Sequence, residues 1–336
     1  MSKPLQHPAA WRGVELLSRP DWRQQLTSDE VFDIRGLQFP HEATLAESIV
    51  LPAALGTRMA AIQHDLEQGS GAVMLKGFPV DNLSEEHARK VFRLLSQHVG
   101  TPVSQSAEGE LVFSVRDEGF AENDPRARGP NTRKKLSFHT DRCDVIAFLC
   151  LKQARVGGDN EVVSSMTLYN EILRQRPDLL AELMKPYWYQ RHNVDLGNEK
   201  SCCRQPIFSF HDGHFAGSFL RVLIERAYQN PDIGPMPEPQ REALDLLETI
   251  ACDPALHARF RQEPGDILFL NNWVTFHRRT EFEDDPNPKQ KRHILRIWLS
   301  VPNSRPLHPL FKDNYGATEA GALRGGMKKR TTRSTK

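Results

Sequence analysis

Two side chains that commonly bind metals stand close together in the segment Phe138-His139-Thr140-Asp141. In an extended segment, residues two positions apart project from the same face, so the imidazole of His139 and the carboxylate of Asp141 point the same way. A histidine from a distant strand would complete a set of two imidazoles and one carboxylate, and His277 is our candidate. Such a set holds octahedral iron on one side and leaves three positions open. Zinc accepts the same three donors.

Two arginines, Arg292 and Arg296, follow His277 in the sequence RHILRIW. On a strand, residues four positions apart share a face, so we expect both guanidinium groups to project together. A guanidinium group forms a planar fork that matches a carboxylate, which would suit a dicarboxylate cosubstrate, and we expect Arg296 to be its anchor. In the alternative interpretation, both arginines lie on the surface and pair with nearby acidic residues, namely Glu281, Glu283, Asp284 or Asp285.

Strands must position these side chains, because the segments that carry them are dense in β-branched and aromatic residues. We expect strands at 71–78, 111–117, 145–155, 207–220 with a turn at Asp212-Gly213, 265–277 and 292–302. Helical periodicity appears on the stripe of Met59, Ile62 and Leu66, from the N-cap Ser84 to Val99, and near 240–250.

This pattern favours a mainly β fold with flanking helices, built on a jelly-roll core of the cupin kind, over alternating βαβ units. We expect one domain over residues 1–320, with a helical N-terminal elaboration and a core at about 70–302. Residues 321–336 carry glycines, threonines and several cations, and are expected to form a basic, disordered tail.

The composition limits the kinds of binding partner and the cellular location that we expect. The chain has 336 residues, with 44 Lys and Arg against 43 Asp and Glu, so no net field would attract nucleic acid or an anionic membrane. The sequence shows neither the apolar run of a signal peptide nor a membrane-spanning stretch, and five cysteines without a C-x-x-C pair suggest reduced thiols. We therefore expect a cytoplasmic protein that acts on a small molecule, with its oligomeric state left open.

Several linked motifs resemble the taurine dioxygenase (TauD/TfdA-like) family of Fe(II)/2-oxoglutarate oxygenases, and are similar to γ-butyrobetaine hydroxylase and clavaminate synthase. The resemblance covers roughly residues 70–302. In family order, the motifs are FHTD at 138–141, LKQARVGGDNEVV at 151–163, FLNNWVTFHRRTEF at 269–282 and RHILRIWL at 292–299.

The resemblance implies a double-stranded β-helix core with Fe(II) on His139, Asp141 and His277. It implies 2-oxoglutarate held at its far carboxylate by Arg296, with Arg292 near the other carboxylate. O₂ would be consumed, succinate and CO₂ released, and an unactivated C–H bond of the substrate hydroxylated. Halogenation is disfavoured, because halogenases of this type lack the carboxylate that Asp141 supplies. Desaturation, ring closure and epoxidation stay open.

Three further residues take roles from the resemblance. Asn160 stands where taurine dioxygenase-like members have a threonine that contacts the cosubstrate, and its amide can still donate a hydrogen bond. Gln105 and Arg116 lie in segments that correspond to substrate-facing parts of the family, so we expect both to contact substrate. No counterpart of a sulfonate-binding set is visible, which speaks against taurine as the substrate.

Two alternatives use the same barrel. A zinc hydrolase could employ His139, Asp141 and His277, but would have no use for the two arginines. A cupin-like binding protein without catalysis would usually lack a ligand or the distal arginine. A Rossmann dehydrogenase and a serine hydrolase are excluded, because neither G-x-G-x-x-G after a strand nor G-x-S-x-G occurs.

Overall fold

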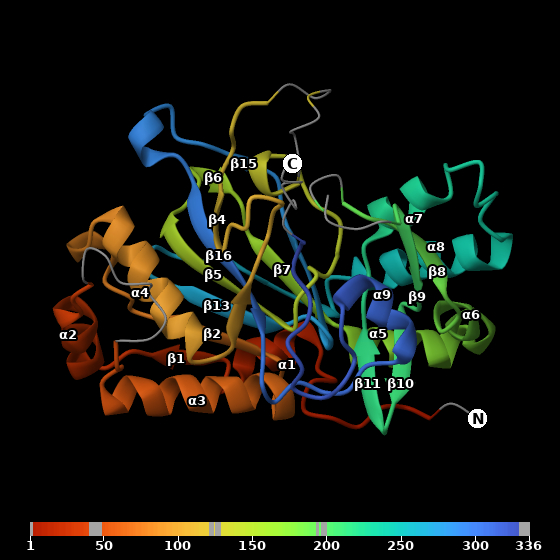
Figure 1. Cartoon of the computed structure of the whole chain (residues 1–336), viewed down its shortest axis with the longest axis horizontal. Coiled ribbons are helices and arrows are strands. Elements are labelled where there is room, and N and C mark those ends of the chain that lie inside the picture. The colour runs from red at the N-terminus through yellow and green to blue at the C-terminus, as the bar shows by residue number, and fades with distance from the viewer. Residues whose placement is uncertain are drawn as a thin grey trace, which may run out of the picture.

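A seven-stranded sheet forms the centre of the protein (Figure 1). The computed structural model describes residues 3–39, 49–120, 124, 129–192, 195 and 200–328. The strands run in the order β1-β2-β13-β5-β16-β3, with β4 also paired to β16, and all described pairs except β1 with β2 are antiparallel. Their bounds are β1 Arg23–Gln25, β2 Ala72–Lys76, β3 Thr101–Val103, β4 Val112–Val115, β5 Val145–Lys152, β13 Ile267–Asn271 and β16 His293–Ser300.

A second, smaller antiparallel sheet runs in the order β12-β7-β14. Apolar side chains of both sheets pack in one cluster, which joins Val162 and Phe260 of the small sheet to Met74, Ile146 and Leu268 of the large one. The small sheet contains β7 Asn160–Ser164, β12 His257–Phe260 and β14 Thr275–Arg279. Two-stranded pairs complete the strands: β6 Val156–Gly157 with β15 Phe282–Glu283, β8 Tyr187–Gln190 with β9 Cys202–Gln205, and β10 Phe208–His211 with β11 His214–Gly217.

Helices cover the sheets from two sides. In Figure 1, α2, α3 and α4 flank the large sheet, whereas α5 to α8 gather beyond the small one. Ser84 caps α4 as predicted, because its hydroxyl accepts a hydrogen bond from the backbone N–H of His87 at 3.2 Å. The helices are α1 Gly13–Ser18, α2 Ser28–Gly36, α3 Ala53–Gln68, α4 Glu85–Gln97, α5 Ser165–Gln175, α6 Pro177–Leu183, α7 Arg221–Ala227, α8 Glu238–Ala251 and α9 Lys312–Tyr315. Single 3₁₀ turns lie at Val80–Asn82, Gly129–Asn131, Pro288–Gln290 and Pro309–Phe311.

The expected strands are present, but two features differ from expectation. Helices hold more of the described residues than strands do, so the description as mainly β is wrong for the chain as a whole. The reason is the helical region between β7 and β12, of which only the last helix, α8, was predicted from the sequence. The segment 265–277 is two strands in different sheets, because a turn at 271–274 separates them, with Val274 N–H bonded to the Asn271 carbonyl at 3.3 Å.

The C-terminal segment also differs from the expected tail. Residues 321–328 lie against the body of the protein, and Arg324 forms a fully buried ion pair with Asp144 at 2.7 Å. Gly325 has a φ of 80°, and a Cβ there would lie 2.6 Å from the carbonyl oxygen of Arg142, so this close approach requires glycine. The remainder of the predicted tail, 329–336, lies outside the described residues.

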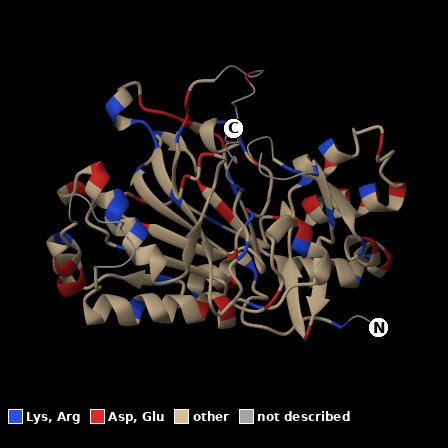
Figure 2. Cartoon of the chain, viewed as in Figure 1, with Lys and Arg blue, Asp and Glu red and all other residues tan. Residues whose placement is uncertain are grey.

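Charges of both signs are interspersed over the outer helices in Figure 2. This mixture agrees with the near balance of 44 basic and 43 acidic residues in the sequence. Within the described part of the chain, every helix is too short or too polar to cross a membrane.

Candidate active site

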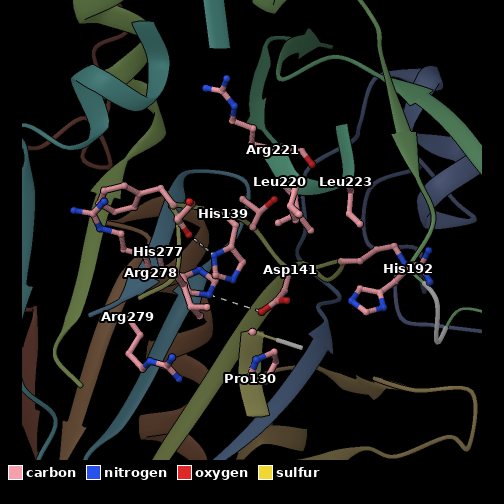
Figure 3. Close-up of a pocket in the computed structure, with 18 of the residues that line it drawn as sticks. Pro130, His139, Asp141, His192, Leu220, Arg221, Leu223, His277, Arg278 and Arg279 are labelled. Atoms are coloured by element: carbon pink, nitrogen blue, oxygen red, sulfur yellow. Dashed lines mark hydrogen bonds and ion pairs between the residues drawn. The ribbon is translucent and has the colours of Figure 1, made fainter. Parts of the chain in front are cut away.

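The three predicted metal ligands come together at the junction of the two sheets. His277 lies on β14, and His139 pairs with it as an isolated antiparallel bridge just before β5. The ligand atoms of His139, Asp141 and His277 all lie within 4.8 Å of one another. Figure 3 shows the three side chains pointing toward one another in the cavity. The predicted convergence is therefore present in the structure.

Neighbouring groups fix the orientation of these side chains. The Nδ1 of His139 lies 2.9 Å from the carbonyl oxygen of Ser137, which fixes Nδ1 as the protonated nitrogen and leaves Nε2 free to act as a ligand. The backbone N–H of Asp141 donates to the side-chain oxygen of Asn272 at 3.2 Å. The sequence analysis did not find Asn272, because its contact with Asp141 depends on the turn between β13 and β14.

The shifted pKa values of His277 and Asp141 favour the protonation states that bind a cation. Burial, and then the neighbouring His139, lower the pKa of His277 to about 3, so its imidazole is neutral near pH 7. Burial alone would raise the pKa of Asp141, but the charge of Arg296 and the two imidazoles outweigh it, and the pKa is lowered. A carboxylate and two neutral imidazoles are the protonation states that bind a divalent metal.

A cavity of about 710 Å³ opens beside the three ligands. Its walls come from the end of β16, the segment before β5, the β8–β9 pair, α7 and the C-terminal segment. Leu220, Arg221 and Leu223 lie on one side of Asp141 in Figure 3, and Arg279 lies on the other. A cavity of this size suits a small molecule beside a cosubstrate.

Arg292 directly precedes β16 and Arg296 lies on it. Both are buried and both line this cavity, so the interpretation as paired surface residues is wrong. Arg296 lies at the ligands, with its Nη1 3.5 Å from Oδ2 of Asp141. The Nε and Nη1 atoms of Arg292 are buried and have no hydrogen-bond partner among the described residues. Burial lowers the pKa of Arg292 to about 10, and the group still carries its charge at neutral pH.

The remaining predicted site residues occupy different positions. Asn160 lines the cavity, and its amide donates to the side-chain oxygen of Gln262 at 3.1 Å. Gln105 is fully buried behind Arg296, whose Nε donates to its side-chain oxygen at 2.7 Å. Arg116 is half exposed and pairs with Glu118 at 2.8 Å. Neither Gln105 nor Arg116 is among the described residues that line the cavity, so their expected contact with substrate is corrected.

The geometry also adds basic residues that the sequence analysis did not place at the site. Arg279 lines the cavity, and burial, followed by the charge of nearby Arg292, lowers its pKa to about 9. Arg191 directly follows β8, and no spacing in the sequence relates it to the metal ligands. Arg279 could have been found from its place two residues after His277, whereas Arg191 could not.

Comparison with known proteins identifies the family. The model of the family described as "Taurine catabolism dioxygenase TauD, TfdA family" matches residues 33–298. The chain belongs to this TauD/TfdA family. FR-33289 synthase of Streptomyces rubellomurinus is 34% identical over 254 residues, which cover 74% of this chain and 75% of that protein. The taurine hydroxylase-like protein SAT17 of Stachybotrys chartarum is 27% identical, over 87% of this chain and 79% of that protein.

Solved structures show the same fold for this TauD/TfdA member. An asparagine oxygenase in complex with Fe(II), 2S,3S-3-hydroxyasparagine and succinate has a TM-score of 0.61 at 18% identity, covering 83% of this chain and 93% of that chain. Family membership supports the oxygenase interpretation, and supports neither the zinc hydrolase nor the cupin-like binding protein.

Proposed function

We propose that this TauD/TfdA family member is an Fe(II)- and 2-oxoglutarate-dependent dioxygenase that hydroxylates a C–H bond of a small molecule, with release of succinate and CO₂. The convergence of His139, Asp141 and His277 within 4.8 Å carries the proposal. Two imidazoles and one carboxylate on one side of a site are the donor set of non-haem Fe(II) oxygenases. The neutral state of His277 and the charged state of Asp141 fit this cation.

The orphaned guanidinium atoms of Arg292 fit the cosubstrate. The sequence analysis assigned the far carboxylate of 2-oxoglutarate to Arg296, but that side chain reaches Asp141 and therefore belongs to the metal end. Arg292 lies directly before β16 and is separated from Arg296 by four positions, about 13 Å of extended chain at about 3.3 Å per residue. We assign the far carboxylate to Arg292 and the metal end to Arg296, which reverses the expected roles.

The wall around Arg292 supports this assignment. A Cβ on Gly158 would lie 3.2 Å from its Nε, so the glycine leaves room beside the guanidinium group. Asn160 lies on the same wall, and we keep its predicted contact with the cosubstrate. Arg279 adds a second buried cation near Arg292. Two buried guanidinium groups without a described carboxylate partner within ion-pair distance favour a dianionic cosubstrate at this end.

The protein's own residues would bind, orient and shield the reactants. When bound, Fe(II) and 2-oxoglutarate would supply the oxidising power for O₂-dependent hydroxylation. His139 and His277 keep their lone pairs free, and Asp141 supplies the negative charge that Fe(II) requires. Phe148 and Trp298 line the cavity beside these ligands, and their apolar rings exclude water from the reacting bond.

The finer description of the fold, partners and compartment belongs to the same proposal. Apolar packing between the large sheet and the β12-β7-β14 sheet supports a double-stranded β-helix, or jelly-roll, core within a single domain. The mixed surface charges support a small-molecule substrate over nucleic acid. The five cysteines, all free, support a reducing, cytoplasmic location.

An anaerobic titration tests the proposal. Purified protein is loaded with Fe(II) and 2-oxoglutarate and examined for the weak visible charge-transfer band that this pair gives. We expect the band in the native protein, its loss in His139→Ala and its retention in His64→Ala, which changes an exposed histidine on α3. A folded, metal-loaded native protein without the band would overturn the proposed function.

A further inference from the structure

The cavity wall is strongly basic, and most of its cations have an evident partner. The described lining contains nine arginine or lysine residues and three aspartate or glutamate residues. Arg221 is surrounded by Glu225, Asp245 and Glu248 at 2.6 to 2.8 Å. Arg278 forms a buried pair with Glu161. Neither of these two arginines offers an uncompensated charge to a ligand.

Three further arginines of the lining lie at the proposed 2-oxoglutarate site or at the metal ligands. Arg292 and Arg279 lie at the proposed far carboxylate, and Arg296 lies at Asp141. Lys135 and Arg226 are exposed on the rim, where water and salt screen their charges. Two arginines of the lining remain: Arg142, which directly follows Asp141, and Arg191, which directly follows β8.

Arg142 forms the first part of this wall. Its Nη1 lies 2.6 Å from Oδ2 of Asp195 and 3.1 Å from the side-chain oxygen of Asn314. Its Nε is buried and has no hydrogen-bond partner among the described residues. The side chain is 13% exposed, so solvent supplies little compensation for the missing hydrogen bond.

Arg191 forms the second part, with a side chain that is only 8% exposed. It donates to the carbonyl oxygens of Lys200 at 2.9 Å and Asp313 at 2.6 Å. Among the described residues, the carboxylate within ion-pair distance of Arg191 is again that of Asp195, at 3.9 Å, which is a looser contact than that of Arg142. Among the described residues, two guanidinium groups with largely buried side chains share one carboxylate, which leaves one positive charge at the cavity.

We propose that Arg142 and Arg191 form a subsite for an anionic group of the substrate, either a carboxylate or a phosphoryl group. A buried net charge is costly unless a counter-ion meets it, and a guanidinium fork matches the oxygens of both groups. Arg142 directly follows Asp141, so the subsite adjoins the metal ligands. In Figure 3, His192, which follows Arg191 in the sequence, lies on the other side of Asp141 from Arg279.

This inference rests on the proposed function, and its test uses the loaded enzyme. Protein is held anaerobically with Fe(II) and saturating 2-oxoglutarate, which occupies Arg292 and Arg296. Methylphosphonate, acetate and neutral acetamide are then titrated by calorimetry. We expect binding of one or both anions and none of acetamide. Tighter binding of methylphosphonate would identify a phosphoryl group, and tighter binding of acetate a carboxylate.

Four variants locate the binding, and Arg142→Gln is expected, like Arg191→Gln, to weaken it. Arg191→Gln is expected to weaken the anion at least about tenfold, the effect of losing a charged hydrogen bond. Asp195→Asn removes the shared carboxylate and is expected to tighten the binding of the anion. This variant also tests the subsite if Arg142→Gln does not fold. Arg155→Gln should leave binding unchanged, because Arg155 pairs with Glu283 and is not part of the described lining.

Two results would overturn the subsite, and they are separable from a failure of the proposed function. Unchanged anion affinity in Arg191→Gln, or binding of acetamide as tight as that of acetate, would exclude it. Loss of the charge-transfer band in native protein would instead contradict the proposed function. The anion titration repeated without Fe(II) and 2-oxoglutarate would then report on the subsite through the difference between native protein and Arg191→Gln, because Arg292 and Arg296 would also be free to bind anions.

Discussion

His139 and His277 each donate a backbone N–H to the other's carbonyl oxygen, both at 3.0 Å. The centroids of the two imidazole rings lie 4.5 Å apart. This reciprocal backbone pairing fixes His139 beside His277 of β14. Such a site loses little conformational entropy when a cation binds.

Arg292 and Arg296 should differ in their effect on 2-oxoglutarate. Arg292→Gln is expected to weaken 2-oxoglutarate about tenfold to a hundredfold, because the far carboxylate loses a charged hydrogen bond. Arg296→Gln should weaken it less and should shift the charge-transfer band, because this side chain contacts Asp141. Anaerobic titration of the band measures both effects. Arg241→Gln, which changes an exposed residue of α8, is the control. The opposite order would restore the roles expected from the sequence.

Gln105 should act through Arg296 and through stability. Its amide donates to the carbonyls of Arg296 at 2.9 Å and Leu111 at 3.0 Å, and its oxygen accepts from Arg296. Gln105→Ala leaves these buried groups unpaired, and we expect a loss of about 1 to 3 kcal/mol in the free energy of unfolding. Urea denaturation measures the loss. Gln38→Ala, at an exposed glutamine, is the matched control, and equal stability of the two variants would contradict this role.

The ion pair between Asp144 and Arg324 should contribute strongly to holding the C-terminal segment against the protein. Both side chains are fully buried, and Asp144 also accepts from the indole of Trp273 at 2.8 Å. Arg324→Met leaves a buried carboxylate without its counter-charge, which should cost about 3 to 5 kcal/mol of unfolding free energy. Glu283→Gln breaks an exposed pair and should change it little. Urea curves recorded for both variants at one pH make the comparison, and similar midpoints would refute the prediction.

The cysteines should differ sharply in their reactivity toward iodoacetamide. Burial raises the pKa of Cys150 to about 12 and that of Cys203 to about 11, so almost no thiolate forms on either at pH 8. Cys252 is exposed and should be modified first. Peptide mass spectrometry after timed labelling gives the order, and labelling in urea shows that every thiol can react. Early modification of Cys150 in folded protein would show that its surroundings open readily.

Short-range pattern was enough to predict most strands and the convergence of His139, Asp141 and His277. His139 and Asp141 share a face because strand geometry repeats every two residues, and His277 lies near the end of an apolar run that a sheet must bury. Family resemblance added the cofactors. The proposed exchange of roles between Arg292 and Arg296 was not predictable, because spacing shows that two side chains share a face but not which one lies nearer the metal.

The rest depends on contacts between distant parts of the chain. Gln105 and Arg296 are 191 residues apart, and their hydrogen bond arises only because β16 pairs with both β3 and β4. The helices between β7 and β12 carry few periodic signals of their own and are stabilised by packing on one another. The anion subsite joins Arg142 to Arg191 through Asp195, a contact that no local pattern indicates.

The path of residues 321–328 has a consequence for the order in which the protein is built. Gly326 and Lys328 donate backbone hydrogen bonds to the carbonyl of Arg142 and to the carboxylate of Asp195, so this segment lies against the cavity wall. It leaves the ribosome after every strand of both sheets, and chains generally fold from the N-terminus during synthesis. The nascent sheets would thus assemble the metal ligands first, and residues 321–328 would enclose the chamber beside them only later in synthesis.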